Sequence, residues 1–362
     1  MVKFKSKHFI FFIIGIVLVS YKSYNSIFIS KGNSNTWIIS IVTSILLILY
    51  GFFLLYVSDK TNNYNFKEII YSSLGNYLGK FYLILFAICL LLTGTECVSV
   101  ESNLIHSNFF LETPVWFISI FFIVSTMYCL SKPLDTLLII TIILIALTII
   151  SGIGLAILVE RYKDYNNLFP VFKQSISFKD LQCFLLQLGC ISSFIIVIPL
   201  IYNVVDKENL KKYSFFSLIF LAQILIFSII GSISSFGANR ASNILYPKLI
   251  QTQRIYYGGF LENGELYVLF QVTASWFLKY VISLSVLFEL FKDKFKNKKK
   301  FAIITSIIIF ILSYFCSKNT FILFKLLEVY QYINLIVFFI LPLLIYMIYL
   351  IKNKKKVIIN TY

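Results

Sequence analysis

The sequence predicts an all-α integral membrane protein in which ten transmembrane helices form two halves of five helices each. Hydrophobic residues make up 59% of the 362 residues and charged residues only 13%, against about 25% charged residues in an average soluble chain. The apolar residues gather into long runs, and about 20 apolar residues suffice to cross a hydrocarbon core of about 30 Å. Because only short polar segments separate the runs, we expect one transmembrane domain over residues 1–362.

Ten apolar runs follow one another along the chain. The first comes after Lys3, Lys5 and Lys7 and is followed by no small-residue cleavage signal, so we expect a retained helix and not a removed signal peptide. The expected spans are 9–29, 36–57, 80–103, 114–131, 134–159, 181–202, 213–236, 265–291, 301–317 and 329–351. The two halves are then residues 9–159 and 181–351.

The basic residues of the loops predict the orientation in the membrane. With a cytoplasmic N-terminus, the inner segments hold 20 lysines and arginines and the outer segments hold 10. Positive residues accumulate on the cytoplasmic side, so both chain ends are expected there. The net charge of +16 is explained by this topology and by contact with anionic lipid, and nucleic-acid binding is not expected.

Polar residues interrupt the first span of each half. In the first span they are Ser20, Tyr21, Lys22, Ser23, Tyr24 and Asn25, and in the sixth span, before Pro199, we single out Gln187, Gly189, Cys190, Ser192 and Ser193. Matched interruptions are typical of transporter folds with inverted repeats, where broken helices expose backbone groups to a ligand at the membrane midplane. The two runs are therefore candidate ligand-binding segments.

Two further charged residues fall in the same layer of the membrane. At 1.5 Å rise per residue, Lys22, Glu96 and Lys279 all lie within about 6 Å of the centres of their spans. An amino-acid zwitterion suits this layer, with its carboxylate near Lys22 or exposed helix N-termini and its ammonium near Glu96. Three alternatives stay open: a Lys22–Glu96 pair or a Lys279–Glu96 pair that only locks helices together, or a Lys22 side chain that reaches toward an interface. Glu101 is expected at the outer interface.

The remaining reactive residues argue against catalysis and metal binding. The six cysteines lie in or beside apolar spans without CxxC spacing, which favours small core residues over a disulfide framework. The only histidines, His8 and His106, lie at membrane edges, and no phosphate-binding loop or catalytic triad pattern occurs. We expect no cofactor, no metal and no enzymatic activity.

Several segments, in order and spacing, resemble the B subunits of bacterial spore-germination nutrient receptors. They are SLGNYLGKFYLILF (Ser73–Phe86), LETPVWFISI (Leu111–Ile120), NLFPVF (Asn167–Phe172) and the stretch from Tyr246 to Leu284. The resemblance implies the amino acid, polyamine and organocation transporter superfamily, with a five-plus-five inverted-repeat (LeuT-like) fold. It also implies a subunit in the inner spore membrane that senses a nutrient, commonly an amino acid, together with an A subunit and a lipoprotein C subunit.

Two departures from that family set this chain apart. The first span has SYKSYNS where relatives carry a glycine-rich break, and the outer loop has FLENGE (Phe260–Glu265) where relatives tend to have an arginine. Without these glycines the backbone is less able to approach a ligand carboxylate closely. Lys22 is then expected to supply the positive charge that the carboxylate needs. A free-standing amino-acid permease and a ligand-free scaffold of the receptor remain alternatives.

Overall fold

The computed structural model describes residues 4–171, 177–256 and 264–359 of the chain. These residues form α1 (Ser6–Ser23), α2 (Asn25–Gly32), α3 (Thr36–Lys60), α4 (Phe66–Asn108), α5 (Val115–Leu130), α6 (Leu134–Val159), α7 (Phe178–Ile191), α8 (Leu210–Phe236), α9 (Ala238–Asn243), α10 (Pro247–Gln253), α11 (Glu265–Phe291), α12 (Lys298–Cys316), α13 (Thr320–Asn334) and α14 (Leu341–Ile359). Between them lie four short 3₁₀ turns, η1 (Asn33–Asn35), η2 (Glu160–Tyr162), η3 (Tyr165–Leu168) and η5 (Lys207–Asn209), together with the 3₁₀-helix η4 (Ser192–Asn203) and the π-helix η6 (Leu335–Ile340).

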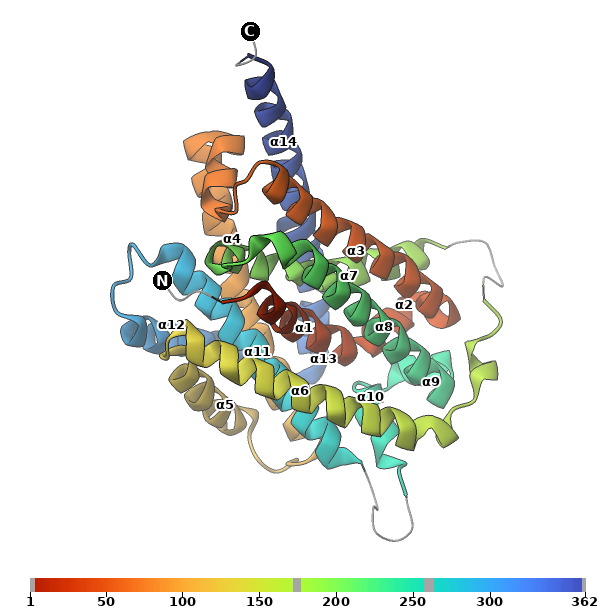
Figure 1. Cartoon of the computed structure of the whole chain (residues 1–362). Helices are drawn as coiled ribbons and strands as arrows, with labels where there is room; N and C mark the ends of the chain where they lie inside the picture. The colour runs from red at the N-terminus through yellow and green to blue at the C-terminus, as the bar shows by residue number, and fades with distance from the viewer. Residues whose placement is uncertain (1–3, 172–176, 257–263, 360–362) are drawn as a thin grey trace.

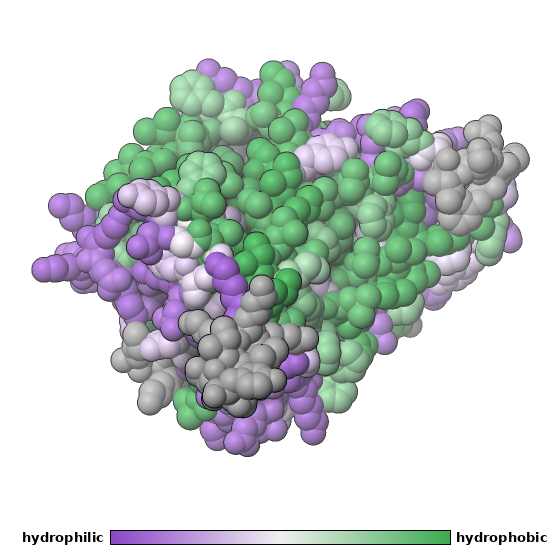
Figure 2. Space-filling view, turned by 90° about the horizontal axis from the view of Figure 1, so that it is seen from above, coloured by the Kyte–Doolittle hydropathy of each residue, from purple (hydrophilic) through white to green (hydrophobic). Residues whose placement is uncertain are grey.

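The helices match the expected membrane spans closely. In the described part of the chain, nine helical stretches have at least 18 residues and enough apolar character to cross a membrane. The fourth expected span corresponds to α5, which is apolar but has 16 residues. Figure 2 shows a face on which apolar side chains form a broad band with hydrophilic residues gathered beyond it. The protein is therefore a multi-pass membrane protein, while the inverted repeat remains a prediction.

The first span lies in the centre of the bundle. α1 packs against α6, α8, α11 and η4, and most of its residues are buried (Figure 1). A helix that is apolar on all sides is expected to be enclosed by others. Any polar side chain on α1 must consequently find its partner inside the protein.

Both interrupted spans depart from regular α-helix at the predicted places. α1 ends at Ser23, and Tyr24, with φ −99° and ψ 17°, separates it from α2. The sixth span begins as α7 and continues from Ser192 as the 3₁₀-helix η4, which contains Pro199. Proline lacks a backbone N–H, and serine hydroxyls bond to nearby carbonyls, so both disfavour a continuous α-helix here.

The two interrupted spans are joined at one end. The Phe4 N–H donates to the Asn203 carbonyl at 3.2 Å, and the Val205 N–H donates to the Phe4 carbonyl at 3.0 Å. Ser6 adds two hydrogen bonds to the Asp206 carboxylate, from its N–H at 2.6 Å and from its hydroxyl at 2.8 Å. We call Phe4, Ser6, Asn203, Val205 and Asp206 the terminal clasp, because it ties the start of α1 to the end of η4.

The third expected span is part of a helix much longer than a bilayer requires. α4 has 43 residues and is kinked at Gly75, whose φ of 77° and ψ of −179° suit glycine but not a residue with a side chain. Glu101 lies seven residues before the end of α4, is enclosed by protein and is only 2% exposed. The expectation that Glu101 is interfacial was wrong.

Five of the six cysteines are buried and Cys316 is half-buried, all as free thiols. Their positions agree with the expectation of core residues. The FLENGE run, Phe260–Glu265, falls mostly in residues 257–263, which lie outside the described part of the chain.

Candidate functional site

A buried ion pair faces the break between α1 and α2. The Lys279 ammonium, on α11, lies 2.6 Å from Glu96 Oε2, on α4. The other carboxylate oxygen of Glu96 accepts hydrogen bonds from the Tyr24 hydroxyl at 2.5 Å and from the Ser20 hydroxyl at 3.2 Å. Lys279 also donates to Ser20 Oγ. We call Ser20, Tyr24, Glu96 and Lys279 the central cluster.

The central cluster is enclosed by protein on all sides. The side chains of Lys279 and Glu96 are 1% and 2% exposed, and Lys279 lies 5.4 Å from the ring of Trp276. Opposite charges in such a low-dielectric place stabilise each other only when hydrogen bonds satisfy their remaining polar atoms. Both oxygens of Glu96 have partners here. Of the two ion pairs that the sequence left open, the structure contains Lys279–Glu96.

Tyr21 and Gln187 lie in a second group, between α1, α3 and α7. The Tyr21 hydroxyl is 2.9 Å from Gln187 Oε1 and 2.8 Å from Ser40 Oγ, and the Thr43 hydroxyl donates to the same Gln187 oxygen at 2.9 Å. Asn25 lies apart from both groups, and its side-chain amide donates a hydrogen bond to Ser232 Oγ on α8 at 2.8 Å. These residues join helices and do not meet the central cluster.

The predicted residues at the change from α7 to η4 bond to backbone groups. Ser192 donates to the Gly189 carbonyl at 2.5 Å and to the Asn334 carbonyl at 3.2 Å. Ser193 donates to the Cys190 carbonyl at 2.9 Å. Gly189 permits a close approach to α13, since a Cβ there would overlap the carbonyl oxygen of Gln331. This junction is therefore packed, and its side chains are turned toward the backbone.

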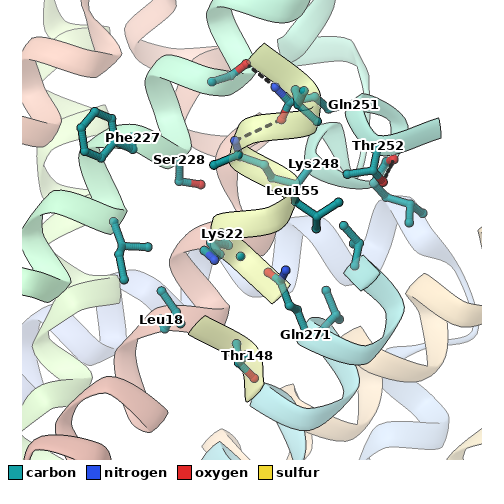
Figure 3. A pocket seen from close by; sticks show the side chains of 18 of the residues that line it. Leu18, Lys22, Thr148, Leu155, Phe227, Ser228, Lys248, Gln251, Thr252 and Gln271 are labelled. Atoms are coloured by element: carbon teal, nitrogen blue, oxygen red, sulfur yellow. Dashed lines mark hydrogen bonds between the residues drawn. The ribbon is translucent and has the colours of Figure 1, made fainter. Parts of the chain in front are cut away.

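Lys22 and Ser23 line a cavity on the other side of α1. It has a volume of about 650 Å³, and α1, α6, α8, α10 and α11 contribute to its walls. Figure 3 shows Lys22 midway along it, with Thr148 toward one end and Lys248 and Gln251 toward the other. A lysine near the centre of a membrane span is expected to face protein or a water-filled cavity, and Lys22 does so. No hydrogen bond or ion pair between described residues involves Lys22.

Lys248 is a cavity residue that the sequence analysis missed. Its ammonium donates to Gln251 Oε1 at 3.2 Å, and Gln251 in turn donates to Ser235 Oγ at 2.6 Å. Burial, helped by the nearby charges of Lys22 and Lys163, lowers the pKa of Lys248 to about 7. The sequence presented Lys248 only as one more loop charge, because nothing in YPKL indicates that α10 folds back onto α8.

The central cluster and the cavity are thus two separate places with different chemistry. The central cluster balances one positive and one negative charge, whereas the cavity has lysines on its wall and Glu160 as the only acidic residue among those that line it. Neither place has the grouped histidine, cysteine or carboxylate side chains of a metal centre, and no such group occurs in residues 4–171, 177–256 and 264–359.

These features define a helical multi-pass membrane protein with interrupted helices, an internal ion pair and a ligand-sized cavity. Residues 4–322 match the family described as spore germination protein, and the chain belongs to this family. The expected relationship to spore germination is thereby confirmed. A search of curated proteins found no match.

Proposed function

We propose that the chain is the nutrient-sensing membrane subunit of a spore germination receptor and that its ligand is a zwitterion such as an amino acid. The observation that carries the proposal is the Lys279–Glu96 pair at the break between α1 and α2. Membership of the spore germination family supports the process, and the balanced charges of the central cluster support the ligand class.

A zwitterion carries the same two charges as the internal pair. Its ammonium can take the place of Lys279 at Glu96, and its carboxylate can take the place of Glu96 at Lys279. The exchange leaves no unpaired charge in a low-dielectric interior, where a single uncompensated charge costs about 3–5 kcal/mol. A simple amine or a simple carboxylate lacks one of the charges, so the same site discriminates against both.

Exchange of the internal ion pair for a zwitterion should also affect the backbone at the end of α1. Ser20 and Tyr24 bond to Glu96 and flank the point at which α1 ends. A ligand that takes over these hydrogen bonds changes the relative stability of two arrangements of α1 and α2. In our proposal this change is passed to an A subunit and a lipoprotein C subunit in the inner spore membrane, without a cofactor or catalysis.

Two tyrosines offer a matched test of the site. Tyr24→Phe removes a hydrogen bond to Glu96, whereas Tyr21→Phe removes an equally buried hydroxyl that faces Ser40 and Gln187. A hydrogen bond to a charged group contributes about 1.5–3 kcal/mol, so Tyr24→Phe should shift the nutrient concentration for half-maximal germination by about tenfold or more. Tyr21→Phe should leave that concentration unchanged. Equal behaviour of the two variants would contradict the proposed site.

The ligand class is identified by germination of spores that lack only this gene, tested on amino acids, sugars and nucleosides. Loss of the response to amino acids alone supports the proposal, and intact responses to every nutrient speak against it. The expectation from the sequence that Lys22 contacts the nutrient carboxylate is an alternative to the central cluster, because Lys22 lines the cavity on the other side of α1. Lys22→Met tests this alternative. If Lys22 contacts the carboxylate, the dose-response moves to higher concentration while membrane insertion is retained.

A stand-alone permease is the second candidate, because interrupted spans and a buried polar cluster are also what a transporter requires. Uptake of a labelled amino acid into vesicles that contain only this protein would favour it. A ligand-free scaffold, in contrast, predicts that Glu96→Gln leaves the nutrient dose-response unaltered.

A further inference from the structure

The cavity is a long slot between two membrane-spanning helices. Its lining residues run from Thr148 on α6 to Glu160 at the start of η2, and from Phe220 to Gly231 on α8. Twelve residue steps along a helix correspond to about 18 Å. The slot therefore extends over more than half of a hydrocarbon core of about 30 Å, which is much longer than a free amino acid.

One flank of the slot lies at the surface that faces lipid. The lining residues Ile153 and Phe227 are 58% and 68% exposed, and they come from α6 and α8 respectively. Ala156, one turn beyond Ile153, is also exposed. Both helices are long and apolar enough to span a membrane. An acyl chain of the bilayer can thus enter sideways between them.

Positive charge gathers toward the end of the slot formed by α10 and the segment after α6. Lys163 there already pairs with Glu160 at 2.6 Å, which uses the only acidic lining residue. Lys248 at this end and Lys22 midway along the slot have no acidic partner among the described residues. The slot thus lacks a carboxylate for the ammonium of a zwitterion, and its charge suits an anion.

We propose that this slot binds an anionic amphiphile from the surrounding bilayer, with its negative group at Lys248 and Lys22 and its hydrocarbon chain between α6 and α8. A phospholipid with a net negative headgroup and a free long-chain carboxylate share this chemistry. Basic pockets between transmembrane helices are suited to such headgroups, and each lysine near an anionic lipid contributes enough to change binding about fivefold. The proposal is independent of the nutrient site.

Native mass spectrometry of the purified full-length protein tests the proposal. The protein is equilibrated with phosphatidylglycerol, with phosphatidylcholine of the same acyl chains, or with oleate. We expect phosphatidylglycerol to be retained at least tenfold more than phosphatidylcholine. Lys248→Gln and Lys22→Met should each reduce its retention about fivefold. Lys80→Gln is the matched control, because Lys80 is exposed and does not line the slot.

Each outcome separates the possibilities. Retention of oleate but not of phosphatidylglycerol supports the anionic amphiphile and identifies the free carboxylate as its source. Equal retention of phosphatidylcholine and phosphatidylglycerol, or insensitivity to both lysine substitutions, overturns the proposal. Ala156→Trp should obstruct the flank and abolish retention of either anion, with the melting temperature showing that the variant is folded. Unchanged retention in this variant places the amphiphile elsewhere and also overturns the proposal.

Discussion

At the scale of single residues, two lysines in the membrane-spanning part of the chain serve different purposes. Lys279 neutralises Glu96 in a dry interior, and Lys22 faces the cavity. Helical geometry explains the difference: Ser20 and Tyr24, four residues apart, share one face of the chain, and Lys22 lies two residues from each. At about 100° per residue, Lys22 points to nearly the opposite side.

The central cluster should be more sensitive to loss of one charge than to loss of both. Lys279→Met leaves the Glu96 carboxylate buried without a cation, so we expect it to destabilise the protein by about 3–5 kcal/mol. The double variant Lys279→Met, Glu96→Gln removes the unpaired charge and should recover much of that loss. Thermal unfolding in detergent measures both. A double variant no more stable than Lys279→Met would show that the ion pair does not govern stability here.

The sequence placed these residues in one layer but left open whether Lys22 or Lys279 pairs with Glu96. Depth along each span follows from counting residues, which placed Lys22, Glu96 and Lys279 together. Contacts depend also on how each helix is rotated about its axis, and this rotation is set by packing against neighbours. The spacing of Ser20 and Tyr24 was the available signal that these two residues act together. Lys248 gave no signal, because its burial depends on how α10 folds back.

At the scale of elements, the departures from regular helix could be predicted, and their form could not. A polar run and a proline indicated where α1 and α7 end. That η4 continues as a 3₁₀-helix over 12 residues depends on its neighbours, α1, α11 and η6. Local sequence states where regular geometry is disfavoured, and tertiary packing decides what replaces it.

Gly189 sets the separation of α7 and α13. Gly189→Ala places a Cβ against the Gln331 carbonyl, which belongs to a helix backbone and cannot rotate away. We expect a destabilisation of about 1–3 kcal/mol, the cost of overpacking. Gly154→Ala is the matched control, because a Cβ at this helical glycine meets nothing within 4 Å. It should be neutral or raise stability by up to about 1 kcal/mol. Unfolding temperatures that rank the variants in the reverse order would refute this account.

The terminal clasp should loosen in acid. Burial opposes ionisation of Asp206, but two hydrogen bonds from Ser6 outweigh it and hold the pKa of the carboxyl below its usual value. A lowered pKa in the folded state contributes stability above the unfolded-state value of about 3.9, and this contribution is lost as the pH falls through the folded-state pKa. Asp206→Asn should therefore reduce stability at neutral pH but have little effect at a pH below the folded-state pKa of Asp206. Amide hydrogen exchange at Ser6 and Val205 measures the effect, and an equal effect at both pH values would exclude Asp206 as its cause.

At the scale of the whole molecule, composition alone determined the class. The ten expected spans all correspond to continuous helical stretches in the described part of the chain, and among these stretches only α5 falls short of 18 residues. The number of spans follows from hydropathy. In lipid, backbone polar groups must be hydrogen-bonded within the protein, so each long apolar run is expected to form a helix. Contacts between segments that are far apart in the sequence do not follow from hydropathy. The clasp between residues 4–6 and 203–206 is an example, since it joins segments 200 positions apart.

Both chain ends should lie in the cytoplasm, as the excess of inner lysines predicts. An epitope inserted between Thr61 and Asn62 should then be protected from protease added to intact cells. The same epitope inserted at Asn166 should be cleaved. Cleavage at the first position and protection at the second would reverse the orientation and place the α10 end of the slot on the inner side.

The free thiols determine how motion in this protein can be observed. Five of the six are buried, so a polar maleimide reagent has access at most to Cys316. Replacing Cys316 by serine gives a protein without an accessible thiol, in which a newly introduced cysteine can be labelled specifically. A cysteine introduced at Ser30, an exposed position near the end of α2, would carry a spin label beyond the helix break. Paired with a second label at the exposed Lys60, at the end of α3, it would report changes in the angle of α2 as nutrients are added.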